Sequence, residues 1–393
     1  MNNTAFYPAD ILLPQCEYNK WSVVACDQFT SEPEYWHKTA EIIGNAPSAF
    51  KMVLPEAFLS KDNAEKIDSI NRTMTEYLND GLFKKYKDAM IFVERTLPKG
   101  KVRYGIIGAV DLKEYDFSVG SKSLIRATEG TVLERIPPRV EVRRNAPLEL
   151  PHIMLLIDDI ERTVIEPLKN AELTVLYDFE LMQGGGHLKG SLVPKEMQDN
   201  ILNAISSLKE KAGNEPLLFA VGDGNHSLAT ARTCYLNAPN ELNRYALVEV
   251  VNIHDEALEF EPIYRVLFNV DTEDFITKLN AEFTEGPKTV KWYTKNNEGE
   301  VYTSGLTVGS LQPFIDNYIK ENPEVVCDYI HGIESTLSLC KEDGRIGLIF
   351  DGMDKGELFP FVSSKGSLPR KTFSMGEAES KRYYCEARKI KQT

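Results

Sequence analysis

One sequence feature constrains the fold of this chain more than any other. It is a short apolar run that leads directly into a polar turn flanked by glycines. Residues 217–221 are apolar, and residues 222–227 read Gly-Asp-Gly-Asn-His-Ser. The apolar run predicts a buried strand, and residues 227–236 predict a helix. Because glycine has no Cβ, Gly222 and Gly224 allow the backbone to turn sharply and to approach a ligand closely. The chain is therefore expected to pass from sheet to helix at this point.

The start of that helix has the chemistry of an anion site. Its first N–H groups lack partners within the helix, and the helix dipole favours negative charge beside them. His226 adds a donor that can titrate near neutral pH, while Asp223 can receive a proton or hold a cation. The remaining candidates for phosphate are Gly222, Gly224, Asn225 and Ser227. The same residue types also form ordinary turns with an Asx cap, so both interpretations stay open.

A second candidate segment is basic although the whole protein is acidic. The formal net charge is −14, yet residues 122–144 hold six basic and three acidic side chains, and residues 365–393 hold eight and three. Guanidinium groups bind phosphate oxygens with a planar fork. Glu129 lies within this basic stretch and could stay ionised and orient a substrate hydroxyl. The other candidates in the segment are Arg126, Thr128, Thr131, Arg135 and Arg139. Solvated faces of surface elements would give the same charge pattern.

Composition and motifs argue against several classes of protein. An acidic balance disfavours a nucleic-acid partner, which normally meets a basic surface. No pair among the six cysteines has metal-ligand spacing, so we expect reduced thiols and no structural zinc. A signal pattern and a membrane-length apolar run are both lacking, which predicts a cytoplasmic protein with no membrane partner. Neither a Gly-x-Ser-x-Gly elbow nor a His-Glu-x-x-His motif occurs, which argues against those hydrolase types.

The expected elements indicate an α+β protein, because helices and strands alternate too irregularly for a doubly wound sheet. We expect three regions. Residues 1–88 form a strand and helix region packed on the core, residues 89–270 form the catalytic core, and residues 271–393 form a C-terminal α/β region. A large insertion at about 146–215 would interrupt the core.

Local patterns also predict individual elements within these regions. The predictions are a strand at 21–26, a helix capped by Ser60 and ended by Asp80, a hairpin with its turn at 98–100, a helix at 153–168, a hairpin tip at 184–186 and a core position for His331.

At these residues the chain resembles a known family, the domain of unknown function 1015. Residues 223–231 resemble its Asp-Gly-His-His-Arg motif, with Asn225 in place of the first histidine and Ser227 in place of the arginine. Residues 128–131, Thr-Glu-Gly-Thr, and the downstream Arg135 resemble its His-Glu-x-Thr motif and following arginine. Two further segments resemble the family, residues 258–265 its Pro-x-His-Arg region and residues 329–332. The resemblance covers nearly the whole chain in order.

That family is similar to the ParB/sulfiredoxin-like fold, which includes free L-serine kinases. The resemblance implies a mixed sheet core with large insertions, and a small phosphorylated metabolite as the ligand. It implies that Glu129 receives the proton of a serine hydroxyl. ADP, ATP or pyrophosphate would be the phosphate donor, with Mg²⁺ bridging its phosphates with help from Asp223. The residues assigned to phosphate are Arg126, Arg135, Arg139, Asp223, Gly224, Asn225 and His226.

Three functions remain open from the sequence. The first is a phosphotransferase acting on a small hydroxylated metabolite, with free L-serine or O-phosphoserine as the leading candidate. The second is a nucleotide-binding regulatory module of the ParB type. The third is a hydrolase of phosphate esters that uses water as the acceptor in the same pocket. No nucleic-acid or membrane partner is expected, and a homodimer is compatible with the sequence.

Overall fold

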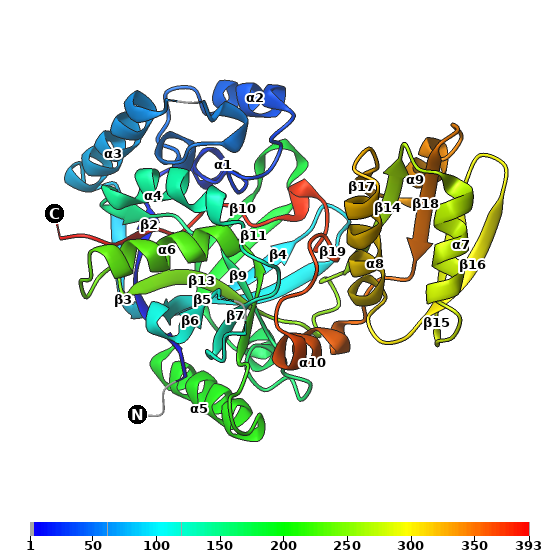
Figure 1. Ribbon diagram of the computed structural model, residues 1–393. Helices are drawn as coiled ribbons and strands as arrows, with labels where there is room; N and C mark the ends of the chain where they lie inside the picture. Colours follow the sequence, from blue (N-terminus) through cyan, green and yellow to red (C-terminus); the bar gives the residue numbers. More distant parts are fainter. Residues whose placement is uncertain (1–3, 61, 119, 393) are drawn as a thin grey trace. The chain divides into compact units, whose positions relative to one another are not determined.

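A computed structural model describes residues 4–60, 62–118 and 120–392 (Figure 1). The chain divides into two compact units. Unit 1 comprises residues 1–258 and 377–393, and unit 2 comprises residues 259–376. This division differs from the three expected regions, because residue 88 lies inside strand β3 (Phe83–Ala89) and the last residues rejoin unit 1. Unit 2 is therefore an insertion into unit 1 near its C-terminal end.

Unit 1 is built on a mixed sheet, as expected for an α+β protein. Parallel pairs join β13 to β9 and β12 to β7, whereas β4, β5 and β13 pair antiparallel. Ten described strands form this sheet, in the order β10 (Thr174–Glu180), β11 (His187–Leu192), β4 (Ile91–Thr96), β5 (Val102–Asp111), β13 (Tyr245–Asn252), β9 (Met154–Ile157), β12 (Phe219–Asp223), β7 (Ile125–Ala127) and β6 (Tyr115–Asp116), with β1 (Phe6–Tyr7) paired to β5.

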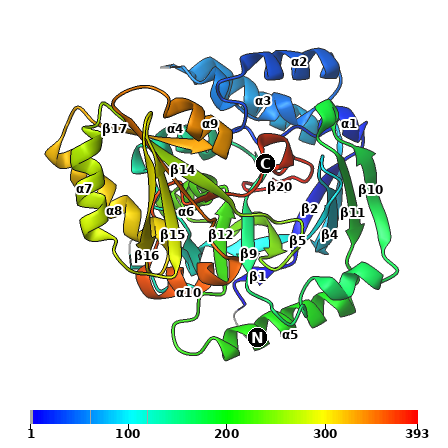
Figure 2. The same cartoon turned by 90° about the vertical axis from the view of Figure 1, so that its right-hand side faces the viewer.

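Both faces of the sheet are buried, because alternate residues of a strand point to opposite sides. Ile91 and Val93 of β4 enter one apolar core, and Phe92 between them enters the other. Figure 2 shows helices on the two sides of the sheet. The first core takes side chains from α2 (Pro33–Ile43) and α3 (Ala64–Asn79), and the second from α4 (Ile136–Arg144), α5 (Lys195–Lys211) and α6 (Asn225–Asn237).

Smaller elements complete unit 1. The remaining α-helix in the described part of unit 1 is α1 (Tyr18–Trp21). Two further pairs of strands are β2 (Ala9–Pro14) with β3, and β8 (Leu148–Glu149) with β20 (Arg388–Lys389). The last pair ties the C-terminal segment to the middle of the chain. Trp21 adds a second tie, since its indole Nε1 donates to the carbonyl of Cys385 at 2.9 Å.

Both predicted hairpins are confirmed. Strands β4 and β5 pair antiparallel around a turn in which Gly100 has φ +88. Strands β10 and β11 do the same around Gly184 and Gly186, with φ +75 and +86. The predicted helix that ends near Asp80 is also present as α3, but its cap position is Asn63 instead of Ser60.

Two of the elements predicted within unit 1 are wrong. Residues 153–168 were expected to be helical, but Met154–Ile157 form β9, which lies between β13 and β12 in the sheet. A continuous apolar run does not distinguish a fully buried strand from a buried helix, and here the strand forms. Residues 21–26 do not form a strand, because Trp21 ends α1 and Val24 makes only an isolated bridge with Tyr383.

The segment 146–215 is part of the sheet. It was expected to be an insertion, yet it supplies β9 near the centre of the sheet and β10 and β11 at its edge. Without β9, β12 would have no partner on the side that faces β13. The segment therefore carries sheet strands of unit 1 together with α5.

Unit 2 has an antiparallel sheet with helices packed on it. Apolar side chains such as Phe275, Leu311 and Leu348 form its core. The sheet order is β16 (Glu298–Thr303), β15 (Lys288–Tyr293), β18 (Arg345–Phe350), β14 (Glu261–Phe268) and β17 (Val326–His331), with β19 (Phe373–Ser374) on β14, and the helices are α7 (Thr272–Glu282), α8 (Thr307–Glu321), α9 (Ile333–Leu339) and α10 (Lys355–Lys365). His331 is exposed at the end of β17, so its predicted core position is wrong.

Two bulk properties of the chain can also be stated. All six cysteines are free thiols, of which Cys340 and Cys385 are buried and the other four half-buried. Among the described residues, no helix has the length and apolar character that a membrane crossing requires.

Candidate functional site

The glycine-flanked turn joins β12 to α6, as the sequence predicts. Asp223 ends the strand, Gly224 has φ +74, and α6 begins at Asn225, two residues earlier than expected. A Cβ at Gly224 would lie 2.9 Å from the Cα of Ile153, so both the left-handed backbone and the close packing require glycine. The carboxylate Oδ1 of Asp223 accepts a hydrogen bond of 2.8 Å from the Gly224 amide. This turn fixes the direction in which α6 starts.

The amino end of α6 has no side-chain cap within the described chain. The amide of Leu228 donates to the Gly224 carbonyl at 3.0 Å, which begins the helical pattern. The amides of Asn225, His226 and Ser227 precede it and form the first turn. Such groups and the helix dipole together favour a bound anion.

The predicted Thr-Glu-Gly-Thr motif, residues 128–131, lies directly beside this turn. The Asn225 amide group Nδ2 donates to the Glu129 carbonyl at 3.3 Å and to Thr131 Oγ1 at 3.0 Å. On the same loop, the Val132 amide donates to His226 Nε2 at 3.2 Å. The loop that carries Glu129 and the start of α6 are therefore held together by three hydrogen bonds.

His226 is held as a neutral imidazole. Burial lowers its pKa to about 4, and the positive charges of Arg139 and Arg135 add to this effect. Its Nε2 is the acceptor for Val132, so the proton of the neutral ring lies on Nδ1. The ring can then offer a ligand one N–H donor without adding a positive charge.

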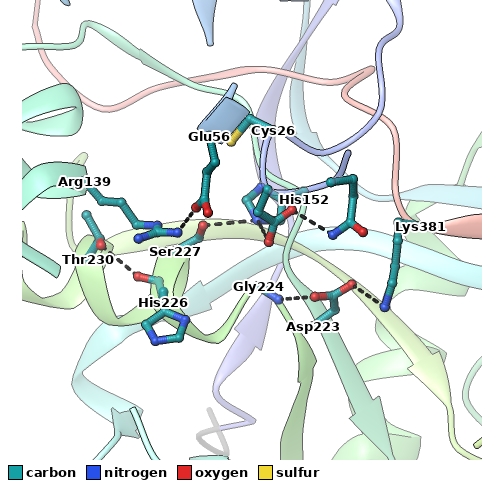
Figure 3. Close-up of polar contacts among 12 residues, drawn as sticks. Cys26, Glu56, Arg139, His152, Asp223, Gly224, His226, Ser227, Thr230 and Lys381 are labelled. Carbon is teal, nitrogen blue, oxygen red and sulfur yellow. Dashed lines mark hydrogen bonds and ion pairs between the residues drawn. The ribbon is translucent and has the colours of Figure 1, made fainter. Parts of the chain in front are cut away.

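Asp223 meets a lysine from the C-terminal segment. The Lys381 ammonium lies 3.4 Å from Asp223 Oδ2, and both side chains are mostly buried (Figure 3). Lys381 belongs to the basic stretch 365–393, which the sequence had indicated as a second basic island. Positive charge therefore reaches the start of α6 from a segment far away in the sequence.

A buried histidine, His152, contacts the first turn of α6. His152 Nε2 is 3.2 Å from Ser227 Oγ (Figure 3). The same Nε2 is 3.6 Å from Asp27 Oδ2, and Nδ1 is 3.0 Å from the Tyr384 hydroxyl. Burial alone would lower the pKa of His152, but the Asp27 carboxylate, with Asp223, raises it. The pKa of Asp27 is in turn held well below its usual range: burial opposes this, and the charge and hydrogen bond of His152 outweigh it.

This arrangement differs from a serine hydrolase triad. In a triad the carboxylate contacts the ring nitrogen that does not face the serine. Here Asp27 and Ser227 both face Nε2, and the other ring nitrogen meets Tyr384. The raised pKa favours an imidazolium that donates from both nitrogens, instead of a base that activates Ser227.

The structure does not bring all the predicted residues to the turn. Arg126 is buried, and its guanidinium donates to the carbonyls of Ser123 and Glu215, which precede β7 and β12 and so lie at the opposite end of these strands. Thr128 donates to the Val221 carbonyl at 2.7 Å and thus fastens the loop to β12. Neither side chain is directed at the start of α6.

Arg135 and Arg139 lie closer to the turn. Arg139 forms an ion pair with Glu56 (Figure 3). It also donates to the Arg135 carbonyl at 2.9 Å. Arg135 is exposed. Both guanidinium groups influence the pKa of His226, so their charge acts on the site.

Sequence reasoning missed Asp27, His152, Tyr384 and Lys381. Only Lys381 carried a signal, through the basic C-terminal stretch. His152 follows Pro151 within an apolar region, where nothing in the local pattern marks it as a site residue.

The side chains that the structure describes do not form a resident metal site. No group of three or more His, Cys, Asp or Glu residues within the described part of the chain could hold a metal ion. Asp223 offers a single carboxylate, already in contact with Lys381. Mg²⁺ commonly binds through one or two carboxylates together with substrate phosphates, so Asp223 fits only a metal that arrives with a phosphorylated ligand.

Comparison with known proteins identifies the family. The model of the family described as "Protein of unknown function (DUF1015)" matches residues 9–389. The chain belongs to this family. No curated protein matches.

Some solved structures are similar to this chain at low sequence identity. A free serine kinase in complex with AMP is 10% identical, covers 74% of this chain and 93% of its own, and gives a TM-score of 0.41. A conserved hypothetical protein from Pyrococcus furiosus is 12% identical, with coverages of 72% and 92% and a TM-score of 0.36. SbnI with a C-terminal truncation, from Staphylococcus aureus, is 9% identical, with coverages of 68% and 81% and a TM-score of 0.37.

Proposed function

We propose that this protein is a phosphotransferase that moves a phosphoryl group from a nucleotide or pyrophosphate to the hydroxyl of a small metabolite. The observation that carries the proposal is the uncapped start of α6, with two charged pairs beside it. Asp223, which ends the strand before α6, contacts Lys381, and His152, which contacts Ser227 of the first turn, also contacts Asp27. Phosphoryl transfer depends mainly on positioning and on neutralising the phosphate oxygens, which this arrangement suits.

The first turn of α6 would hold the donor phosphates. The amides of Asn225, His226 and Ser227 and the Nδ1 proton of His226 would donate to phosphate oxygens. Lys381 would add a positive charge, and Mg²⁺ bound to the donor phosphates would neutralise further charge beside Asp223. Gly222, Gly224 and Thr131 would act by shaping the turn and by orienting Asn225.

Glu129 is the proposed base. Its loop is tied to Asn225 and His226, so its backbone lies next to the phosphate site. The acceptor oxygen would bond to the terminal phosphorus as the bond to the bridging oxygen of the donor breaks, and the hydroxyl proton would pass to the Glu129 carboxylate. Free L-serine is the acceptor that the family resemblance implies. A ParB/sulfiredoxin-like fold for unit 1 belongs to the same proposal.

The test is a transfer assay with the purified full chain. ATP, ADP and pyrophosphate are supplied with Mg²⁺ and a panel of alcohols that includes L-serine, and phosphorylated product and free phosphate are measured together. Product that depends on both donor and alcohol supports phosphotransfer. Free phosphate at the same rate with and without any alcohol would indicate a hydrolase instead. Tight nucleotide binding with neither product would indicate the regulatory module.

A further inference from the structure

A cavity of about 160 Å³ opens beside Ser227 and His152, within unit 1. Helix α4, the first turns of α6 and the segment 52–59 contribute its walls. Its volume is close to that of an engineered apolar cavity, about 150 Å³, that binds benzene. A group with about six carbon atoms would therefore fill it.

The walls of this cavity are largely apolar. Met52, Leu54, Met74, Val142, Leu148 and Leu150 all line it. Ligand sites generally combine such walls with a few polar groups that fix orientation. Here the uncharged polar groups are the hydroxyls of Ser227, Thr230 and Tyr384, which lie on the side of His152 and α6.

The charged groups that line the cavity already have partners, and these groups include His152, which lies 3.6 Å from the Asp27 carboxylate. Arg139 pairs with Glu56, and Arg143 pairs with Glu149 at 2.5 Å. Glu149 is almost fully buried and also accepts from Arg388 at 2.6 Å. An ammonium or carboxylate group inside the cavity would have to break one of these pairs or remain unpaired, and either is costly in a buried place. The walls therefore favour an uncharged occupant.

We infer that this cavity binds the acceptor, and that the acceptor is a small alcohol with an apolar body of about six carbon atoms. The body would fill the space between α4 and the segment 52–59, and the hydroxyl would point to Ser227 at the first turn of α6. This inference rests on the proposed phosphotransferase function and narrows its substrate class. It favours an apolar alcohol over a zwitterion such as L-serine.

Binding of benzyl alcohol to the full chain tests the inference without any phosphate donor. Its affinity is measured by ligand-observed NMR, beside L-serine and the cationic analogue benzylamine. Val142→Trp places an indole in the cavity from α4, and Val175→Trp makes the same change at an exposed position on β10. We expect benzyl alcohol to bind at least tenfold more tightly than benzylamine or L-serine. We expect Val142→Trp to weaken it at least tenfold and Val175→Trp to leave it unchanged.

Equal binding of benzyl alcohol to Val142→Trp and to the unchanged protein would overturn the inference, as would L-serine binding that Val142→Trp abolishes. If Val142→Trp does not fold, Leu59→Trp at the partly exposed rim of the cavity replaces it.

The proposed function is assessed separately, by pyrophosphate binding and phosphoryl transfer. Cavity binding with no transfer to any alcohol would reject the phosphotransferase, whereas transfer to L-serine with no cavity binding would reject the inference alone.

Discussion

The Lys381 ammonium lies 3.4 Å from the Asp223 carboxylate, so a residue of the C-terminal segment meets the turn that begins α6. Two neighbouring guanidinium groups position this segment. Arg95 donates to the carbonyl of Glu379 at 3.0 Å, and Arg103 donates to that of Ser380 at 3.2 Å. These contacts fix the backbone of the two residues before Lys381. They therefore also fix the backbone position from which the Lys381 side chain extends.

Replacing Lys381 by methionine should weaken phosphate binding. A hydrogen bond to a charged group contributes about 1.5–3 kcal/mol, which corresponds to about ten- to a hundredfold in affinity. Isothermal titration with pyrophosphate, with and without Mg²⁺, measures the change. Lys391→Met removes a lysine from the same segment away from the turn and should bind pyrophosphate normally. Unchanged affinity in Lys381→Met would show that this ammonium serves only to pair with Asp223.

Replacing Glu129 by glutamine should stop turnover and preserve ligand binding. The amide keeps the size of the side chain but cannot receive the hydroxyl proton, and general-base catalysis contributes about 10²–10⁴-fold in rate. The rate of phosphoryl transfer and the affinity for pyrophosphate are measured on the same preparation. Glu134→Gln, at an exposed position of the same segment, is the matched control. Normal turnover in Glu129→Gln would remove the proposed base.

Replacing Asp27 by asparagine should destabilise the protein in a pH-dependent way. The raised pKa of His152 means that its ionised form stabilises the fold fully below the ordinary value of 6.5, and that this contribution is lost as the pH rises through the folded-state pKa. The lowered pKa of Asp27 means that its contribution is present above its ordinary value of 3.8 and is lost on acidification. The pair therefore stabilises most at about pH 5–6.

We expect Asp27→Asn to lower the free energy of unfolding by on the order of 2 kcal/mol at pH 5.5, because one partner of a mostly buried pair is lost and water screens the rest. The loss should be smaller at pH 9. Urea unfolding at both pH values measures it, and Asp68→Asn on the exposed face of α3 is the control. An equal loss at the two pH values would mean that His152 is not ionised in the fold.

Replacing Arg139 by leucine should raise the pKa of His226 from its value of about 4. Burial would still lower it, but one of the two positive charges that lower it further would be gone, and Glu56 would keep its negative charge. Because the folded-state pKa lies below the ordinary 6.5, the unchanged protein should lose stability as the pH falls from 6.5 towards 4. NMR titration of the His226 ring follows the pKa. Arg144→Leu on the same helix should leave it unchanged, and a similar effect in both variants would contradict the assigned cause.

The local sequence was sufficient to predict the strand, turn and helix around Gly224. Three local signals were present: an apolar run, a glycine suited to a left-handed position, and a helical pattern after it. Each of them can be read from residues that are adjacent in the sequence. The hairpins around Gly100 and Gly186 were predictable for the same reason. Sequence also indicated that residues 128–131 belong with the turn, through the resemblance to the family.

The prediction failed where tertiary contacts decide the structure. Residues 154–157 are apolar throughout, and only their place between β13 and β12 makes them a strand. Arg126 was assigned to phosphate because it is a guanidinium near Glu129. In the folded protein its guanidinium instead donates to the carbonyls of Ser123 and Glu215. His152 was not predicted because its partners, Asp27 and Tyr384, come from the two ends of the sequence.

The return of the chain to unit 1 after residue 376 has a consequence for biosynthesis. Lys381 and β20 are translated after the whole of unit 2, although they belong to the unit whose first strands were made at the start. A nascent chain that has emerged only as far as residue 376 lacks the ammonium beside Asp223 and the hydroxyl beside His152. Residues 377–392 must therefore leave the ribosome before the pocket around α6 can be assembled, whatever order the rest of the sheet forms in.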